Sequence, residues 1–183
     1  MDREPAPLLI SAVAGIAPGR ALDLACGAGR HALYLAQAGW SVTAVDSSAV
    51  GIGILRDRAD AAGVAIDTRI ADLETGEFLL EENAYDLICD CNYLQRDLFP
   101  RMRAAVRPGG RVVVMLQMVD DSPDVAPMNP AYLARPGELR EFFNGWEILH
   151  DTETRPKPES RMVAELIARR ETAPFGHGSD RVC

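Results

Sequence analysis

The stretch Leu22-Asp-Leu-Ala-Cys-Gly-Ala-Gly-Arg-His31 decides the fold class of this chain. It continues an apolar run that begins at Arg20 and is typical of a strand. It leads into a segment from Arg30 to Ala38 that has the apolar spacing of a helix. Glycines at such a strand-to-helix turn are typical of open α/β sheets, which bind ligands at the carboxyl ends of their strands. The stretch therefore predicts an α/β fold with a ligand site at this turn.

Strands and helices alternate along the rest of the chain. A proline-rich, polar stretch at 120–136 is too long for a simple turn, and we expect it to be a functional loop. The last two expected strands follow each other without a helix, which indicates an antiparallel edge on a mostly parallel sheet. The further expected strands are 40–45, 65–71, 85–91, 111–119, 146–153 and 161–169, and the further expected helices are 8–16, 98–106, 137–143 and one capped by Ser47 that ends at Ala62, with a turn at 107–110.

Length and composition limit the class of protein. The chain has 183 residues, of which 48% are hydrophobic and 25% charged, which suits one globular domain at 1–170 followed by a loose tail at 171–183. A net charge of -8 argues against a nucleic-acid partner, since phosphate binding needs a basic surface. No apolar run approaches the ~20 residues that span a bilayer. With no signal peptide and no zinc-type spacing among the cysteines, we expect a cytoplasmic protein without a membrane segment or metal site.

The glycine-rich turn alone does not identify the ligand. Residues 27–32, Gly-Ala-Gly-Arg-His-Ala, fit the GxGxxG/A fingerprint of dinucleotide-binding proteins, and Asp46 lies near the expected distance of ~20 residues. Gly27 and Gly29 let a ligand press against the backbone. Asp23 precedes the turn and would repel a pyrophosphate, whereas S-adenosylmethionine carries an ammonium and a sulfonium that a carboxylate attracts. We therefore favour S-adenosylmethionine over a nicotinamide dinucleotide.

Carboxylates at three adjacent strand ends support this interpretation. Asp46 can accept hydrogen bonds from two ribose hydroxyls. Asp72 can accept from the adenine amino group, with the amide of Leu73 beside it as a donor. Asp46 and Asp72 can equally be helix caps, and Asp23 can be a buried structural acid.

Three other residues near these strand ends have structural interpretations. We expect His31 to lie in the first turn of a helix and to face the rim of the pocket rather than to act as a base. Cys89 and Cys91 alternate with Ile88 and Asp90 along a strand, and we expect them to pack in the core. These residues therefore add no predicted catalytic group.

The run Asp23-Leu-Ala-Cys-Gly-Ala-Gly29 resembles motif I of class I S-adenosylmethionine-dependent methyltransferases, D/E-x-G/A-x-G-x-G. Tyr85-Asp-Leu-Ile88 and Arg107-Pro-Gly-Gly-Arg-Val-Val-Val114 resemble the fourth strand of that class and the turn into its fifth strand. The resemblance covers residues 18–170. It implies a Rossmann-like, doubly wound seven-stranded sheet of order 3-2-1-4-5-7-6, with strand 7 antiparallel, in a three-layer sandwich.

Within this class the chain is similar to the tellurite-resistance (TehB-like) methyltransferases. The similarity is carried by Gly29-Arg-His-Ala-Leu-Tyr-Leu-Ala36, Ala71-Asp-Leu73 and Arg135-Pro-Gly-Glu-Leu-Arg-Glu-Phe-Phe-Asn-Gly-Trp-Glu147. The chain differs from that group in the short segment before motif I, so we expect less cover over the substrate. It also differs in the short loop before the last strand, which lacks histidine and arginine content typical of the group. These differences leave the methyl acceptor open.

The resemblance implies a role for each part of the site. The motif residues hold the methionine portion, Asp46 and Ser47 the ribose, and Asp72 and Leu73 the adenine. Residues 90–93 lie beside the transferred methyl group, and the loop 120–135 with Tyr132 forms the substrate face. The expected cofactor-binding residues are Asp23, Ala25, Cys26, Gly27, Gly29, Arg30, Asp46, Ser47, Asp72, Leu73, Asp90 and Cys91.

The sequence thus predicts a methyltransferase that acts on a small molecule such as a thiol, an amine or a metalloid oxyanion. The sulfonium is already activated, so orientation alone can supply most of the acceleration and no catalytic residue is assigned. Two alternatives stay open, a non-catalytic S-adenosylmethionine-binding module and a nicotinamide-dependent oxidoreductase. The second lacks a Tyr/Lys set, since Lys157 is the only lysine. The oligomeric state is also open, and in a dimer a second subunit could cover the site.

Overall fold

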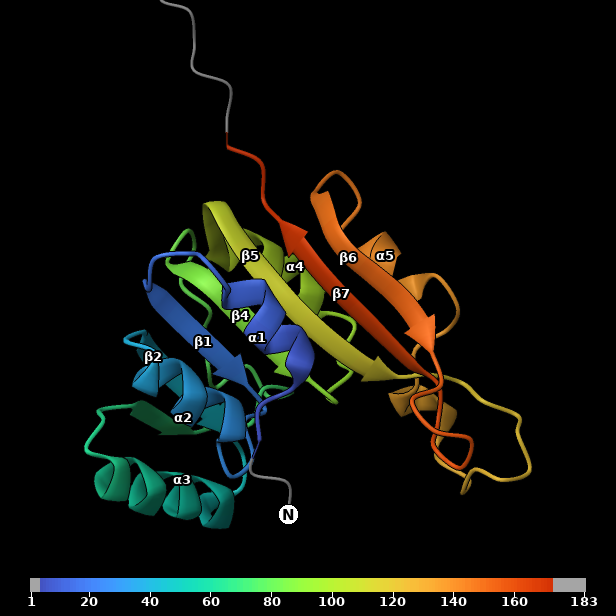
Figure 1. Ribbon diagram of the computed structural model, residues 1–183, viewed down its shortest axis with the longest axis horizontal. Coiled ribbons are helices and arrows are strands. Elements are labelled where there is room, and N and C mark those ends of the chain that lie inside the picture. The colour runs from blue at the N-terminus through green and yellow to red at the C-terminus, as the bar shows by residue number, and fades with distance from the viewer. Residues whose placement is uncertain (1–3, 173–183) are drawn as a thin grey trace, which may run out of the picture.

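Seven strands form one sheet through the middle of the protein (Figure 1). The computed structural model describes residues 4–172. The strands are β1 (Arg20–Leu24), β2 (Ser41–Asp46), β3 (Asp67–Ile70), β4 (Tyr85–Cys91), β5 (Val106–Gln117), β6 (Glu147–Thr154) and β7 (Val163–Arg169). Their order is β3-β2-β1-β4-β5-β7-β6. β7 runs antiparallel to both of its neighbours, and the other pairs are parallel, so the predicted order and the predicted antiparallel strand are confirmed.

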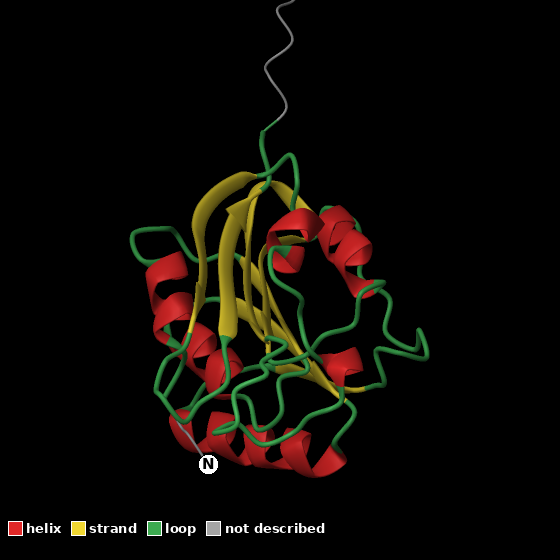
Figure 2. Ribbon diagram, turned by 90° about the vertical axis from the view of Figure 1, so that its right-hand side faces the viewer, coloured by secondary structure: helices red, strands yellow, loops and turns green. Residues whose placement is uncertain are grey.

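Helices cover both faces of this sheet (Figure 2). They are α1 (Pro7–Val13), α2 (Arg30–Gln37), α3 (Ala49–Ala62), α4 (Leu98–Ala105) and α5 (Glu138–Phe142), with a short 3-10 turn, η1 (Pro130–Tyr132). α1, α2 and α3 pack on one face, and α4 and α5 pack on the other.

Two buried clusters fill the spaces between these layers. β5 contributes to both, because successive side chains of a strand point to opposite faces. Val113 joins the cluster that includes Leu35 of α2 and Leu55 of α3. Val112 joins the cluster that includes Phe99 of α4. The predicted three-layer sandwich is therefore confirmed.

Two local predictions are wrong in detail. β2 extends through Asp46, so the chain turns one residue later than expected, and the N-cap of α3 is Ser48 rather than Ser47. The Ser48 hydroxyl accepts a hydrogen bond from the Gly51 amide at 3.1 Å. The predicted turn 107–110 is a bulge within β5, because β4 pairs on both sides of it. The other element boundaries differ from the prediction by a few residues.

The predicted loose tail 171–183 lies mostly outside the described residues, which end at 172. The division into one domain at 1–170 and a tail therefore stays a prediction. No helix within residues 4–172 has the length and apolar content needed to cross a membrane.

Candidate functional site

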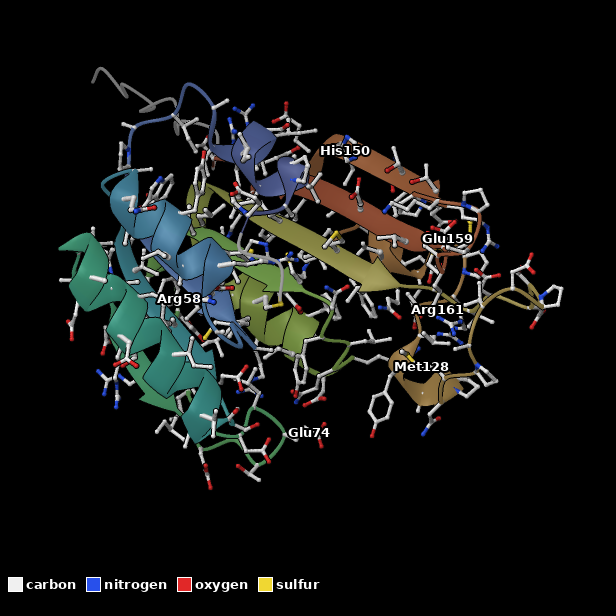
Figure 3. The ribbon with its side chains drawn as sticks, turned by 60° about the horizontal axis from the view of Figure 1, so that its bottom comes forward. Arg58, Glu74, Met128, His150, Glu159 and Arg161 are labelled. Carbon is white, nitrogen blue, oxygen red and sulfur yellow. The ribbon has the colours of Figure 1, made fainter. Side chains whose placement is uncertain are left out.

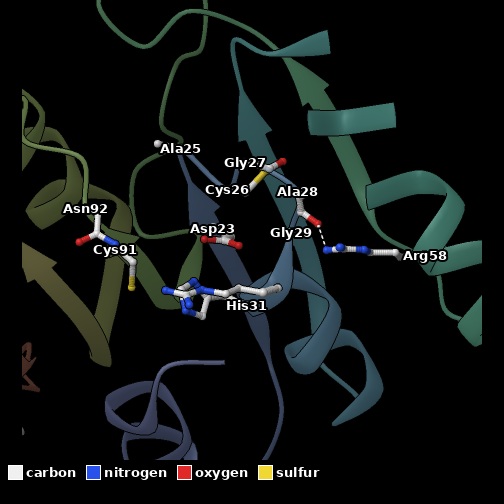
Figure 4. Close-up of a pocket in the computed structure, with 11 residues that line it drawn as sticks. Asp23, Ala25, Cys26, Gly27, Ala28, Gly29, His31, Arg58, Cys91 and Asn92 are labelled. Carbon is white, nitrogen blue, oxygen red and sulfur yellow. Dashed lines mark hydrogen bonds between the residues drawn. The ribbon is translucent and has the colours of Figure 1, made fainter. Parts of the chain in front are cut away.

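A cleft of about 240 Å³ opens where β1 leads into α2 (Figure 4). It lies at the turn that the sequence singles out, and it brings together much of the predicted methionine-binding set. The predicted residues on its wall are Asp23, Ala25, Cys26, Gly27, Gly29, Arg30 and Cys91, and the wall is completed by Ala28, His31, Arg58 and Asn92. The predicted residues that do not line it are Asp46, Ser47, Asp72, Leu73 and Asp90.

The loop between β1 and α2 uses its glycines for two different purposes. Gly27 has a φ of 55° and Gly29 a φ of 74°, both in the left-handed region that favours glycine. A Cβ added at Gly27 would meet no atom within 4 Å, so the backbone there is open to a ligand. A Cβ added at Gly29 would lie 2.2 Å from the Leu55 side chain. The prediction that both glycines make room for a ligand is therefore wrong for Gly29. The missing side chain there makes room for α3.

Ala25 also has a left-handed backbone, with a φ of 48°. Such a conformation is uncommon for a residue with a side chain, and strained backbone of this kind clusters at functional sites. It lets the chain leave β1 and turn immediately around the cleft.

Asp46 holds this loop from the end of β2. One of its carboxylate oxygens accepts a hydrogen bond from the Gly27 amide at 2.7 Å, and the other accepts from the Ser48 amide at 2.8 Å. A carboxylate offers about four acceptor positions, so both oxygens can accept further hydrogen bonds. The predicted contact with a ribose stays a prediction that this geometry allows.

Asp23 forms the floor of the cleft. Its side chain is 1% exposed, and Oδ2 accepts a hydrogen bond from the Ala32 amide at 3.0 Å. Burial raises the pKa of Asp23 to about 7, although the neighbouring His31 opposes that shift. A cation that binds beside this carboxyl therefore favours its ionised form.

Arg58 belongs to the cleft but is absent from the sequence prediction, and Asn92 belongs to the segment 90–93 that was expected beside the methyl group. Arg58 lies on the side of α3 that faces α2, and its Nη1 donates to the Ala28 carbonyl at 2.9 Å (Figure 3). Arg58 follows the buried Leu55 by three residues, a helical spacing that places both on one face, and this was the signal available in the sequence. Asn92 follows β4 with a φ of 67°, and the sequence indicated it only as part of the segment 90–93.

Asp72 and Leu73 lie beyond the end of β3. The carboxylate of Asp72 accepts from the Glu74 amide at 2.9 Å and so stabilises its own turn, but no helix lies in the described segment between β3 and β4, so the alternative of a helix cap is wrong. The Leu73 carbonyl accepts from the side-chain amide of Gln95 at 3.2 Å. Their predicted contact with adenine stays a prediction.

Asp90 is completely buried on β4, away from the cleft wall. Neither of its carboxylate oxygens has a hydrogen-bond partner among residues 4–172. Burial raises the pKa of Asp90 well above its usual range and so favours the neutral acid.

His31, Cys89 and Cys91 meet at the wall of the cleft, where Cys89 lies behind the other two. The two thiol sulfurs lie 3.7 Å apart, and the ligating atoms of the three residues all lie within 4.8 Å of one another. His31 is buried rather than at the rim, and Cys91 lines the cleft rather than packing only in the core. A hydrogen bond from the Cys89 thiol, supported by His31, lowers the pKa of Cys91 to about 5. No short motif in the sequence indicates this cluster, because His31 is remote from both cysteines along the chain.

The loop 120–136 is fastened at both ends by buried carboxylates. At its start, Asp120 accepts from Arg155 at 2.8 Å. At its end, Glu138 accepts from the Arg96 guanidinium at 2.7 and 3.0 Å and from the Arg135 amide at 2.9 Å. Burial opposes ionisation of Glu138, but the hydrogen bonds from Arg96 and Arg135 outweigh it and lower its pKa to about 2.

The Arg96 guanidinium also fixes the short turn that carries Tyr132. Its other N–H groups donate to the carbonyls of Ala131 and Leu133, on either side of Tyr132. Tyr132 itself is 59% exposed. One ion pair therefore positions a large exposed side chain on the predicted substrate face.

The Glu138→Gln variant is expected to lower the free energy of unfolding by about 2 kcal/mol. Breaking a buried ion pair costs ~3–5 kcal/mol, and the loss is smaller here because Arg96 is partly exposed to solvent. Urea unfolding of this variant and of Glu141→Gln, an exposed position on the same helix, measures the difference. Equal stability of the two variants would contradict the role of Glu138.

Comparisons with known proteins bear on this cleft and this loop. The family described as tellurite resistance protein TehB matches residues 7–157 of the chain. The chain belongs to the TehB family. The resemblance expected from the motifs is thereby confirmed. The TehB match includes the cleft and the whole loop and ends before β7.

Individual relatives support the TehB assignment. A protein of Haemophilus influenzae named as a probable S-adenosyl-L-methionine-dependent methyltransferase TehB is 29% identical over 180 residues, covering 89% of this chain and 61% of the relative. The crystal structure of TehB from Haemophilus influenzae superposes with a TM-score of 0.76 at 26% identity, covering 89% of this chain and 61% of that one. The chain thus spans about three fifths of the length of these TehB relatives. A methyltransferase structure from Mesorhizobium loti shares the fold, with a TM-score of 0.69 at 21% identity over 90% of this chain and 96% of that one.

Proposed function

We propose that this protein transfers a methyl group from S-adenosylmethionine to a small-molecule acceptor. The observation that carries the proposal is the buried carboxyl of Asp23 at the floor of the cleft, beside a loop that leaves space over Gly27. The names of the TehB relatives support the same activity. S-adenosylmethionine, when bound, supplies a methyl group on a positively charged sulfur that a nucleophile can attack directly.

The cleft carries the charges that suit the methionine portion. Asp23 can bind the ammonium group, and Arg30 and Arg58 on the wall can bind the carboxylate. The volume of about 240 Å³ is below the ~300–1,000 Å³ typical of ligand pockets, so the cleft suits one part of the cofactor. We place the ribose at Asp46 and the adenine near Asp72, along the neighbouring strand ends. In this arrangement the pyrophosphate of a dinucleotide would lie beside Asp23. Its negative charge would repel the ionised carboxyl and keep Asp23 protonated. This repulsion disfavours a dinucleotide.

On the proposed acceptor side of the site, Tyr93 is not a base. Burial raises the pKa of Tyr93, just after β4, to about 12, and its hydroxyl donates to Gln95 at 2.9 Å. Tyr93 is therefore a neutral hydrogen-bonding group. We propose that the residues around it and Tyr132 orient acceptors that are already nucleophilic, namely thiols, amines and metalloid oxyanions. Orientation of this kind can supply up to ~7–11 kcal/mol of the reduction in barrier.

The affinity for S-adenosylhomocysteine is expected to fall about tenfold between about pH 8 and about pH 6. The raised pKa of Asp23, about 7, means that the carboxyl is mostly ionised above that pH and mostly protonated below it. The ammonium group of the ligand binds the ionised form, so affinity is full at the higher pH and is lost as pH falls. Calorimetry across this range measures the effect.

The Asp23→Asn variant is the control for this pH dependence. It is expected to bind more weakly at about pH 8 and to show a flatter profile than the wild type, since the side chain at position 23 no longer titrates. A wild-type profile that is equally flat would remove Asp23 from the ammonium site.

Calorimetry and a turnover assay test the proposed function together. S-adenosylhomocysteine should bind, NADH should not, and Asp46→Ala should weaken binding by ~1–3 kcal/mol, the scale of hydrogen bonds to a charged group. Release of S-adenosylhomocysteine is then followed with thiols, amines, phenols, selenite and tellurite as acceptors. Binding of NADH in place of S-adenosylhomocysteine would overturn the proposal. Binding without turnover on any acceptor would favour a non-catalytic binding module.

A further inference from the structure

We propose that His31, Cys89 and Cys91 bind one Zn²⁺ ion, with the fourth coordination position open to the cleft. The two cysteines lie two residues apart on β4 and so project from the same face of the sheet. His31 lies in the first turn of α2, which packs over that face. The sheet and the helix therefore bring two thiols and one imidazole together, a ligand set that zinc favours.

The thiols already have the separation that a tetrahedral zinc site needs. Zinc–sulfur bonds of about 2.3 Å at tetrahedral angles place two sulfurs about 3.8 Å apart. The Cys89 and Cys91 sulfurs lie 3.7 Å apart, well beyond the ~2.05 Å of a disulfide bond. The corresponding nitrogen–sulfur separation is about 3.6 Å, given zinc–nitrogen bonds of about 2.0–2.1 Å. The ligating atoms all lie within 4.8 Å of one another, so a side-chain movement of His31 can bring its nitrogen to this separation.

The imidazole of His31 has an unused hydrogen-bonding atom at this place. His31 is 4% exposed, and its Nε2 has no hydrogen-bond partner among the described residues. A buried polar atom without a partner costs free energy, and a metal ion would satisfy it. The Asp23 carboxyl lies beside the His31 ring, where it can support a metal-bound imidazole (Figure 4).

Charge balance favours a divalent cation, and the ligand types favour zinc over hard cations. Binding of Zn²⁺ releases to solvent the protons that the two cysteines and the imidazole still hold, and leaves two thiolates and a neutral imidazole around the ion. The formal charge of the complex is zero, so its burial avoids the large penalty of an uncompensated ion. Hard cations such as Mg²⁺ prefer oxygen ligands, which these three residues do not offer.

The ion has a route to this site. His31 and Cys91 line the cleft, whereas Cys89 is fully buried behind them. An ion can therefore enter from the cleft and keep one coordination position directed toward it. Such an open position is typical of zinc sites that bind a further small ligand.

Metal content of the purified protein tests the proposal. The protein carries Cys183→Ser, which removes the cysteine outside the described residues, and is kept in a reducing buffer. After dialysis against excess Zn²⁺ and then against metal-free buffer, we expect one zinc per chain by mass spectrometry. Replacement with Co²⁺ should produce the intense visible bands of a tetrahedral site together with thiolate charge-transfer bands. Absence of retained zinc from this Cys183→Ser parent protein would overturn the proposal.

Single substitutions identify the ligands. Cys91→Ser and His31→Gln should each weaken zinc binding by at least about 100-fold, the upper end of the loss that removal of a second-shell partner causes. Cys26→Ser, in a cysteine that lines the cleft outside the cluster, should retain zinc as the parent protein does. Zinc binding by Cys91→Ser equal to that of the parent would overturn the assignment. Calorimetry with S-adenosylhomocysteine on the same samples reports the proposed function separately, so either result can fail alone.

Discussion

Replacing Gly27 by valine is expected to abolish binding of S-adenosylhomocysteine while the protein stays folded. A side chain at this position would meet no protein atom within 4 Å and would occupy the space proposed for the cofactor. The left-handed backbone, with a φ of 55°, adds a strain of roughly 1–2 kcal/mol, which a folded domain tolerates. Calorimetry should show a loss of at least about 100-fold, equivalent to about 2.8 kcal/mol.

Gly63→Val is the matched control for this experiment. Gly63 ends α3 with a φ of 66°, and a Cβ there also meets no atom within 4 Å. The backbone strain is therefore similar, but Gly63 does not line the cleft. Both variants should lose similar stability in urea, and only Gly27→Val should lose affinity. Comparable affinities in the two variants would show that the loop does not bind the cofactor.

Replacing Gly29 by alanine is expected to lower the free energy of unfolding by roughly 2–4 kcal/mol. The added Cβ would lie 2.2 Å from a methyl group of Leu55, a fully buried residue of α3, so side chains must shift in a filled core. The φ of 74° adds backbone strain. Urea unfolding measures this loss, which should exceed that of Gly27→Ala at a similar φ.

A double variant tests whether Leu55 is the cause. Leu55→Ala alone should cost about 2–5 kcal/mol because it leaves a cavity. In the Gly29→Ala/Leu55→Ala protein the new methyl group fills part of that cavity, so the combined loss should be smaller than the sum by ~1–2 kcal/mol. Strictly additive losses would mean that the two positions do not compete for the same space.

The fold could be predicted because its signals are local. Strand-to-helix alternation and the glycines after β1 are visible in short windows of sequence, and motif resemblance supplied the strand order that periodicity alone could not fix. The predictions that were wrong concern the exact residues at which one element ends and the next begins. The cap moved from Ser47 to Ser48 because β2 is one residue longer than its apolar pattern.

The part of the cleft that contiguous residues form could be predicted from the sequence. Gly27 and Asp23 were identified because a glycine turn and a preceding carboxylate are contiguous in the sequence. Arg58 and the cluster of His31 with the two cysteines were not, because their proximity depends on how α2 and α3 pack on the sheet. A short stretch of sequence does not show such contacts, because they join residues that are far apart along the chain.

Because two ion pairs fasten the loop 120–136, a change in the length of this loop need not change the stability of the sheet. Arg155 with Asp120 and Arg96 with Glu138 hold its ends, so insertions or deletions between these anchors need not disturb β5 or α5. The free-energy cost of lengthening a loop grows only slowly with the number of residues. This segment can therefore vary in length and sequence among related proteins. Such variation could change the methyl acceptor while the cleft for the methyl donor stays constant.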